Sequence, residues 1–263
     1  MNHWRYPRSR LLIKSNTPYP VAPSQTFIFE WVAMVGRYSR RSLSDPDDKL
    51  IAISAIASRF GARLRISYIA GLWSYQLIDQ LDWYVTEPCS RPTKYRAPSW
   101  SWASIDGHID FYGINESSEK SKLVEILAVN VEPKNKDFEY GAIESAYLVL
   151  EGLLMPASWL LNRRCLHSVN GKWTRSPSVY KDAIEKSWDT IDPDFVVEVQ
   201  CLPIFSTTHR RLSWLPPYYT GLLLVPDPLA SNGYRRVGLF CWYSSNENPF
   251  PFKDAERRVM TLY

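Results

Sequence analysis

A histidine and an aspartate two residues apart come closest to a catalytic pair in this sequence. His108 and Asp110 stand in the stretch GHIDFY, which has the residue types of a strand. Side chains at i and i+2 of a strand point to the same side, so an imidazole base and an orienting carboxylate could face one substrate there. A polar pair on the surface of a hairpin explains the same spacing without a reaction, and we favour that explanation. The remaining histidines, His3, His167 and His209, are isolated from one another.

Three aspartates within four positions could ligate a metal ion. Asp45, Asp47 and Asp48 follow Ser44 in the stretch SLSDPDDKL. Helix capping uses all of them, because Ser44 or Asp45 can accept hydrogen bonds from the first N–H groups of a helix. Pro46 is tolerated in the first turn, and acids there favour the helix dipole. We therefore predict a helix start at this point and no metal site.

Other arrangements with a recognisable local spacing are missing from the sequence. It has no Gly-x-Ser-x-Gly elbow, no GxxxxGK[ST] or GxGxxG loop for phosphates and no HExxH helix. The cysteines form no CxxC pair, which favours reduced thiols over disulfides or a zinc site. They are Cys89, Cys165, Cys201 and Cys241. Four glutamates in strand-like runs have no spacing that pairs them, although the carboxylates of a glycosidase can meet in three dimensions. They are Glu125, Glu132, Glu144 and Glu151. The sequence thus predicts no catalytic, cofactor-binding or metal-binding residue.

The stretch YRAPSWSWASIDG, residues 95–107, is the most distinctive in the chain. Tryptophans alternating with small residues predict a strand that starts near Pro98 and carries Trp100 and Trp102 on one face. Asp106-Gly107 is a dipeptide that type I′ hairpin turns prefer, so we expect the chain to turn back there. Exposed indoles could stack on sugars or bases. A buried tryptophan, however, stabilises a fold by about 3–5 kcal/mol relative to alanine, so burial is the more favourable use of these side chains. We therefore predict instead that both belong to the core.

The composition is that of an ordinary soluble globular chain. Of 263 residues, 45% are hydrophobic and 22% are charged, and the formal net charge is +4. Residues 1–26 carry a basic excess (Arg5, Arg8, Arg10 and Lys14) and are interpreted as an irregular arm. No basic helix or zinc-finger spacing supports nucleic-acid binding. No apolar run is long enough for a signal peptide or a membrane span, so we expect an intracellular, cytoplasmic protein.

Helical periodicity dominates the N-terminal third, and strands follow. Apolar residues recur at helical spacing in residues 27–38, 50–60 and 67–84. Later runs predict strands; they are KLVEILAVNVEP, SAYLVLEGLLM, FVVEVQCLPIF, TGLLLVP, YRRVGLFCWY and RRVMTLY. We interpret residues 155–194 as an insertion with a tight turn at VNGKW. The predicted fold is α+β, one domain over 27–263, with a helical part (27–85) and a mostly antiparallel β sandwich or barrel-like unit (86–263).

YRAPSWSWASIDG resembles the signature found downstream of the HET (heterokaryon incompatibility) domain in filamentous-fungal proteins. The signature positions are Tyr95, Arg96, Pro98, Trp100, Trp102, Asp106 and Gly107. Two earlier segments are similar to segments of the same family, YSRRSLSDPDDKLIAISAIASRF and YIAGLWSYQLIDQLDWY. GLLLVP, YRRVGLF and FKDAERRVMTLY resemble its closing strands. In order, these matches cover roughly residues 28–263.

The resemblance concerns only the companion region that lies C-terminal to the HET domain. Neither of that domain's own strands, a Leu-Ser-Tyr-x-Trp-Gly-like run and a Trp-Ile-Asp-x-x-Cys-Ile-like run, is present. The resemblance therefore implies a non-enzymatic structural or interaction module, truncated or without its effector, with an unidentified protein partner. It relates to non-self recognition and cell death only through the family. The alternative is a stand-alone ligand-binding β module or hydrolase that uses surface aromatics, and exposure of Trp100 and Trp102 would distinguish the two.

Overall fold

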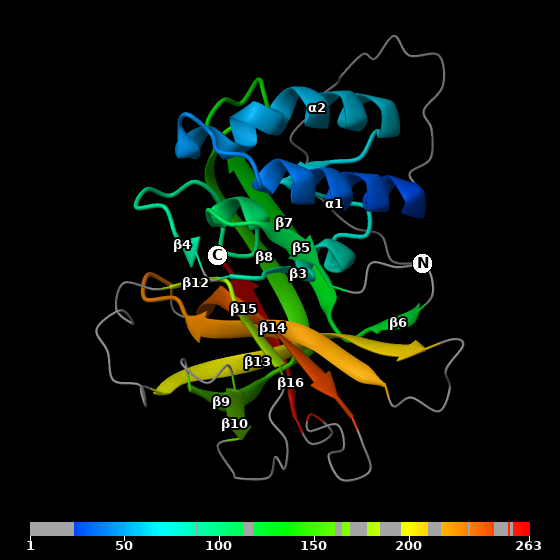
Figure 1. The fold of residues 1–263 in the computed structure, drawn as a ribbon, viewed down its shortest axis with the longest axis vertical. Helices are drawn as coiled ribbons and strands as arrows, with labels where there is room; N and C mark the ends of the chain where they lie inside the picture. The colour runs from blue at the N-terminus through cyan, green and yellow to red at the C-terminus, as the bar shows by residue number, and fades with distance from the viewer. Residues whose placement is uncertain are drawn as a thin grey trace.

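The structure, a computed structural model, describes residues 24–87, 89–112, 118–160, 165–168, 178–184, 196–209, 217–230, 232–244, 252 and 255–263. Two helices lie at one end of the molecule and a large twisted sheet makes up the rest (Figure 1). The prediction of an α+β fold with its helices at the N-terminal side is confirmed. Nearly all of the basic arm falls outside the described residues.

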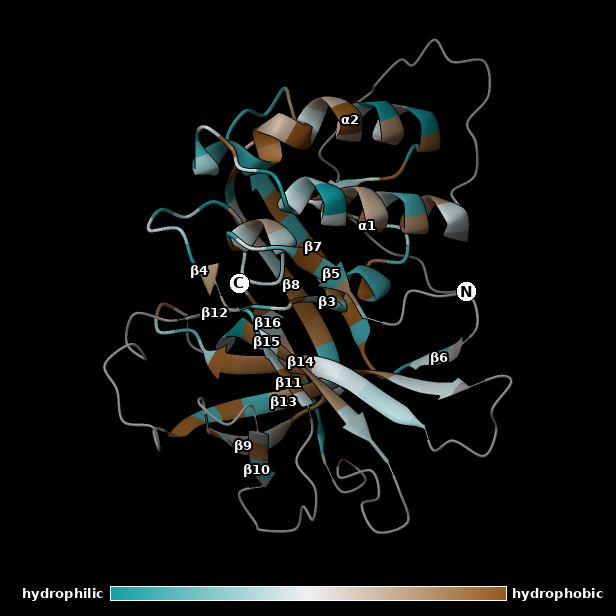
Figure 2. Cartoon of the chain, viewed as in Figure 1, coloured by the Kyte–Doolittle hydropathy of each residue, from teal (hydrophilic) through white to brown (hydrophobic). Residues whose placement is uncertain are grey.

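The two long helices form where the sequence predicts them. Helix α1 (Gln25–Ser39) starts at Ser24, whose side chain accepts a hydrogen bond from the Phe27 N–H. Helix α2 (Lys49–Leu64) follows a single 3₁₀ turn, Pro46–Asp48. The two helices meet through aromatic rings, with the centroids of Phe27 and Phe60 at 5.4 Å. Figure 2 shows hydrophobic and hydrophilic residues alternating along both helices, as expected of helices with one buried face.

The helix predicted over residues 67–84 is wrong. The segment forms a hairpin of β1 (Tyr68–Ile69) and β2 (Leu72–Trp73), a 3₁₀ helix (Ile78–Leu81) and β3 (Trp83–Val85). Both residues of the hairpin loop have positive φ, 52° at Ala70 and 95° at Gly71, as a type I′ turn requires. The Gln80 amide then bonds the N–H and the carbonyl of Trp73, which supplies partners that a helix would have provided.

The large sheet contains ten strands, of which eight follow one another in the order β10-β9-β13-β14-β15-β16-β8-β7. Their bounds are β7 (Glu125–Pro133), β8 (Ile143–Leu153), β9 (Met155–Leu160), β10 (Cys165–Ser168), β13 (Val196–His209), β14 (Tyr218–Pro226), β15 (Gly233–Tyr243) and β16 (Arg257–Leu262). Two more strands lie beside this path, β6 (Ser118–Lys122) on β13 and β11 (Ser178–Lys181) on β15. All pairings in the sheet are antiparallel except β15 with β16. In the described part of the chain, the end strands β10 and β7 do not pair, so the sheet is not closed.

Both faces of the central strands are buried. Leu222 and Leu224 of β14 contribute to a core shared with the helices, whereas Leu223 and Val225 contribute to a second core on the opposite face. This explains why TGLLLVP is continuously apolar instead of alternating.

Two small strand pairs connect the helical part to the sheet. Strand β3 pairs with β5 (Ile109–Phe111), and β4 (Cys89–Ser90) runs parallel to β12 (Ala183–Ile184). Strands β9 to β12 belong to the stretch interpreted as an insertion, and β9, β10 and β11 are members of the large sheet. VNGKW lies outside the described residues. Among the described residues, no helix is long and apolar enough to cross a membrane.

Candidate functional site

Trp100 and Trp102 are core residues, and the prediction of their burial is confirmed. Both indoles have 0% exposed surface. The predicted strand is wrong, because residues 99–101 form a turn and Trp102–Ser104 form a 3₁₀ helix. The Ser101 hydroxyl caps that helix by accepting a hydrogen bond from the Ala103 N–H at 3.1 Å. Every tryptophan in the described part of the chain is buried.

The predicted type I′ turn at Asp106-Gly107 is also wrong. The φ angle of Gly107 is not positive, and β5 beyond it pairs with β3 and not with the signature. Gly107 is needed for a different reason, since a Cβ atom there would lie 2.8 Å from the Cys89 sulfur. The close approach of two chain segments explains this glycine.

The signature residues hydrogen-bond segments that are distant in sequence. Trp102 Nε1 donates to the Gly71 carbonyl at 2.8 Å, and Trp100 Nε1 donates to the Leu262 carbonyl at 3.2 Å. The Ser99 N–H donates to the Tyr263 carbonyl at 2.9 Å. The signature therefore links the hairpin of the helical part to the C-terminal strand.

Arg96 is the polar centre of this arrangement. Its Nε donates to the Ala103 carbonyl at 2.7 Å, Nη1 to the Pro46 carbonyl at 2.6 Å and Nη2 to the Asp106 carboxylate at 2.7 Å. Because guanidinium nitrogens lie in one plane, one side chain can fix three directions at once. Arg96 thereby holds the signature against the turn that starts α2. Pro98 is buried, while Tyr95 is half-exposed.

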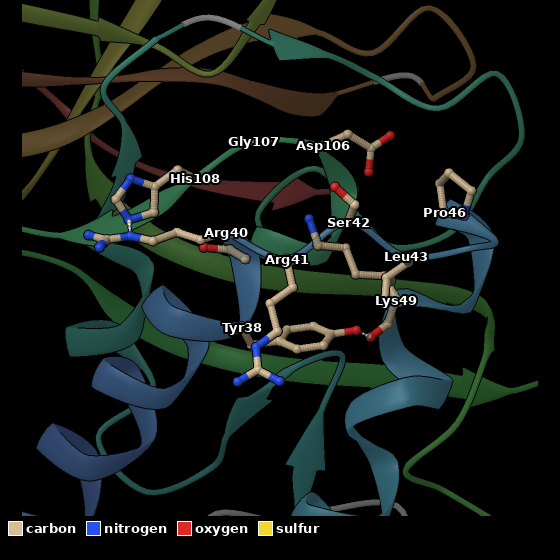
Figure 3. A pocket seen from close by; sticks show the side chains of 11 residues that line it. Tyr38, Arg40, Arg41, Ser42, Leu43, Pro46, Lys49, Asp106, Gly107 and His108 are labelled. Atoms are coloured by element: carbon tan, nitrogen blue, oxygen red, sulfur yellow. Dashed lines mark hydrogen bonds between the residues drawn. The ribbon is translucent and has the colours of Figure 1, made fainter.

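A pocket of about 520 Å³ opens between the α1–α2 connection and the Asp106–His108 bend (Figure 3). Its lining includes three cationic side chains, Arg40, Arg41 and Lys49, and the single carboxylate of Asp106. Tyr38 forms part of the wall and donates its hydroxyl to the Lys49 carbonyl at 2.7 Å. The pocket is therefore basic, and its walls come from two segments that are distant in the sequence, residues 38–49 and 106–108.

Lys49 is a buried cation without a carboxylate partner in the described part of the chain. Its ammonium group donates to the Ile105 carbonyl and lies 5.6 Å from the centre of the Trp102 ring. Burial, and next the charge of Arg96, lower the pKa of Lys49 to about 8. Desolvation opposes the charged form of Lys49, and an anion bound nearby would favour that charged form.

His108 contacts Arg40 across the pocket mouth. Arg40 Nε donates to His108 Nε2 at 2.6 Å (Figure 3). The pairing of His108 with an orienting Asp110 stays a hypothesis, and the geometry offers Arg40 as the partner of the imidazole instead. His167 is exposed on β10, His3 lies outside the described residues, and the side chain of His209 does too.

Asp45 is the cap that the sequence suggested. Its carboxylate accepts a hydrogen bond from the Asp47 N–H at 2.9 Å and begins the 3₁₀ turn before α2. Asp47 pairs with Lys94 on the surface at 3.8 Å. Within the described residues, no group of three or more His, Cys, Asp or Glu side chains could hold a metal ion.

The structure brings together two of the four glutamates. Glu125 of β7 and Glu151 of β8 are directly opposite each other, and Arg257 Nε contacts Glu151 at 3.4 Å. Three cysteines whose side chains are described are free thiols, Cys89, Cys201 and Cys241. Burial raises the pKa of Cys89 and of Cys241 to about 11, which keeps both thiols protonated at neutral pH.

Sequence reasoning did not anticipate the buried ion pairs. Arg236 has no exposed surface, donates to the Asp182 carboxylate at 2.8 Å and stacks on the Trp83 ring with its Cζ 3.4 Å from the ring centre. Asp82 pairs with Lys120 at 3.0 Å, and burial raises the pKa of Asp82 to about 6. Two consecutive arginines in the apolar strand YRRVGLF are a signal for Arg236, because alternation must point one of them inward.

Comparison with protein-family models, with curated proteins and with solved structures finds no match to this chain.

Proposed function

We propose that this chain is a non-enzymatic interaction module of the kind that follows the HET domain in fungal proteins. One observation carries the proposal: the segments that resemble this family are bonded to one another through their own distinctive side chains. Trp102 reaches the carbonyl of Gly71, Arg96 that of Pro46, and Trp100 that of Leu262. The signature thus serves to assemble four separate stretches into one unit.

Burial of the indoles bears on the alternative of surface aromatics. A stacking platform needs exposed ring faces, and Trp100 and Trp102 have none. Both indole N–H groups already bond backbone carbonyls inside the core. The signature is therefore not available as a sugar- or base-stacking surface, and this version of the ligand-binding module loses its premise.

The outer edge of β7 supports the interaction part of the proposal. In the described part of the chain, β7 ends the strand order and no strand pairs with its outer edge. Leu127 of β7 is exposed, and Val124, Ile126 and Val129 line a groove beside the strand. An edge strand presents free N–H and C=O groups, which is how sheets accept an extended segment of a partner.

Expression in a fungal host that lacks relatives of this family tests the absence of enzymatic activity. The intact chain, the His108→Ala variant and an empty vector should give the same growth and the same cellular dinucleotide levels. Cell death or dinucleotide loss with the intact chain, abolished by His108→Ala in a folded protein, would contradict the proposal.

A second experiment in the same host tests the interaction surface by proximity labelling. Leu127→Lys should weaken labelling of the proteins that the wild-type chain labels. Leu229→Lys, at a 94% exposed position away from β7, is the matched control and should leave it unchanged. Equal labelling by both variants would exclude the β7 edge as the docking surface.

A further inference from the structure

We propose that the basic pocket between α1, α2 and the Asp106–His108 bend binds phosphate, as the free ion or as the phosphate group of a small molecule. This inference goes beyond the interaction module and is independent of it, because it depends on the pocket alone. The charge balance of the lining is the first observation. The lining holds three cations, Arg40, Arg41 and Lys49, and one carboxylate, that of Asp106, which is already paired with Arg96 at 2.7 Å. The acids at 45, 47 and 48 do not line the pocket.

Free hydrogen-bond donors are the second observation. Within the described residues, the guanidinium of Arg41 has no protein partner, and Arg40 uses only its Nε, toward His108. The terminal nitrogens of two guanidinium groups therefore remain available at one pocket. A planar guanidinium binds two oxygens of a phosphate at once, so these are the donors that such a group requires.

The buried ammonium of Lys49 is the third observation. It is 5% exposed and has a carbonyl and a ring face as neighbours where a buried cation ordinarily has a carboxylate. In Figure 3 its side chain extends from the start of α2 toward the middle of the pocket. A bound dianion would supply a counter-charge to this ammonium, whose pKa burial and Arg96 lower to about 8.

The dipole of α1 does not account for the whole cluster. The C-terminal end of a helix favours a cation, which explains Arg37 and Arg40. It does not explain why Arg41 and Lys49, from the connection and from the next helix, line the same pocket. The volume of about 520 Å³ lies in the range of small-molecule sites, roughly 300–1,000 Å³, and Tyr38, Leu43 and Pro46 offer apolar contact to an organic group.

Calorimetric titration of the full chain tests the site with four probes: inorganic phosphate, ribose 5-phosphate, ribose, and a single-stranded RNA of about 20 nucleotides. We expect both phosphates to bind and ribose not to bind. Tighter binding of ribose 5-phosphate assigns the phosphate to an organic carrier, and equal binding assigns the free ion. Both results support a phosphate site.

Two variants that each remove one positive charge test whether the phosphates bind in this pocket. Arg41→Gln should weaken the binding of both phosphates roughly tenfold to a hundredfold, the ratio expected for loss of a charged hydrogen bond. Arg37→Gln is the matched control, because Arg37 is exposed on α1 and does not line the pocket. Arg41 is exposed as well, so folding should survive the change, as circular dichroism can verify.

Three results would overturn the proposal. The first is that neither phosphate binds at concentrations up to roughly 10 mM. Even a marginal site, with a dissociation constant in the millimolar range, would be mostly occupied at that concentration. The second is an equal loss in Arg41→Gln and Arg37→Gln, which would indicate diffuse surface attraction. The third is binding of the RNA alone with a steep salt dependence, which would indicate a polyanion surface.

Discussion

The indole of Trp102 is at once a core side chain and one of two donors, with Trp31, to the Gly71 carbonyl in the β1–β2 turn. Trp102→Ala should lower the free energy of unfolding by about 3–5 kcal/mol. Trp102→Phe keeps most of the buried area and loses one hydrogen bond, so we expect a smaller loss than for alanine, of which the hydrogen bond accounts for about 1 kcal/mol. Urea titrations measure both. Leu229→Ala serves as control and should stay within about 0.5 kcal/mol of the wild type.

Lys49 should give stability a particular dependence on pH. Its pKa is lowered to about 8 in the folded chain by burial and by Arg96, against about 10.4 when unfolded. Between these values the unfolded chain binds more protons than the folded chain, so the contribution of Lys49 to stability rises with pH. The free energy of unfolding of the wild type minus that of Lys49→Met should therefore become more positive from about pH 7 to about pH 9.5.

Two charged or titratable neighbours act on Lys49 besides Arg96, namely Asp106 and Cys89. The pKa of Cys89 is raised to about 11, so its thiol stays neutral over this range. Subtracting the Lys49→Met curve removes titrations common to both proteins. A difference that is flat with pH would show that the ammonium is not buried as described.

At the scale of elements, the start of α2 depends on one carboxylate. Asp45 accepts from the Asp47 N–H, so Asp45→Ala should cost about 0.5–2 kcal/mol. Ser44 makes no cap bond in the structure, and Ser44→Ala is the neighbouring control that should cost nearly nothing. Thermal melts compare the two, with and without magnesium and calcium. A rise in melting temperature on adding either ion would mean that the acids form a metal site.

The elements also show what a sequence can and cannot predict. Strands β7, β8 and β13–β16 were predictable because each run is apolar on the face or faces that it buries. Residues 67–84 were not, since the apolar spacing of Ile69, Leu72 and Trp73 fits a helix and a hairpin equally well. Their conformation is decided by contacts from far away: Trp31 and Trp102 both donate to the Gly71 carbonyl. The pocket was missed for the same reason, because Arg41, Lys49 and His108 come together only in the fold.

At the scale of the whole molecule, the buried Arg236–Asp182 pair joins β15 to the residue between β11 and β12, and Arg236 itself reaches the helical part. Arg236 also donates to the carbonyls of Leu81 and Trp83, so Arg236→Met removes several bonds at once. Breaking a buried ion pair costs about 3–5 kcal/mol, and we expect a loss of that size. Asp182→Leu alone should cost a similar amount.

A double-mutant cycle separates the pair from the rest of the packing. The double variant Arg236→Met with Asp182→Leu should be less destabilised than the sum of the single variants, by about 1–3 kcal/mol. It should remain less stable than the wild type, because the Leu81 carbonyl still lacks its donor. Additive effects would mean that the two side chains do not interact energetically.

Strand β16 lies between β15 and β8. The backbone carbonyl of Leu262 accepts a hydrogen bond from Trp100, 162 positions away, and that of Tyr263 accepts one from Ser99, 164 positions away. During synthesis, the signature emerges from the ribosome long before residues 257–263 exist. Until then Trp100 and Ser99 lack their native acceptors, whereas the acceptor of Trp102, the Gly71 carbonyl, is already present. Helices α1 and α2 can form early, but Trp100 stays without its native acceptor until β16 has been synthesised. The speed of translation during that interval and the capture of the nascent chain by chaperones would then govern how much protein reaches the native fold. The strength of any one contact would matter less.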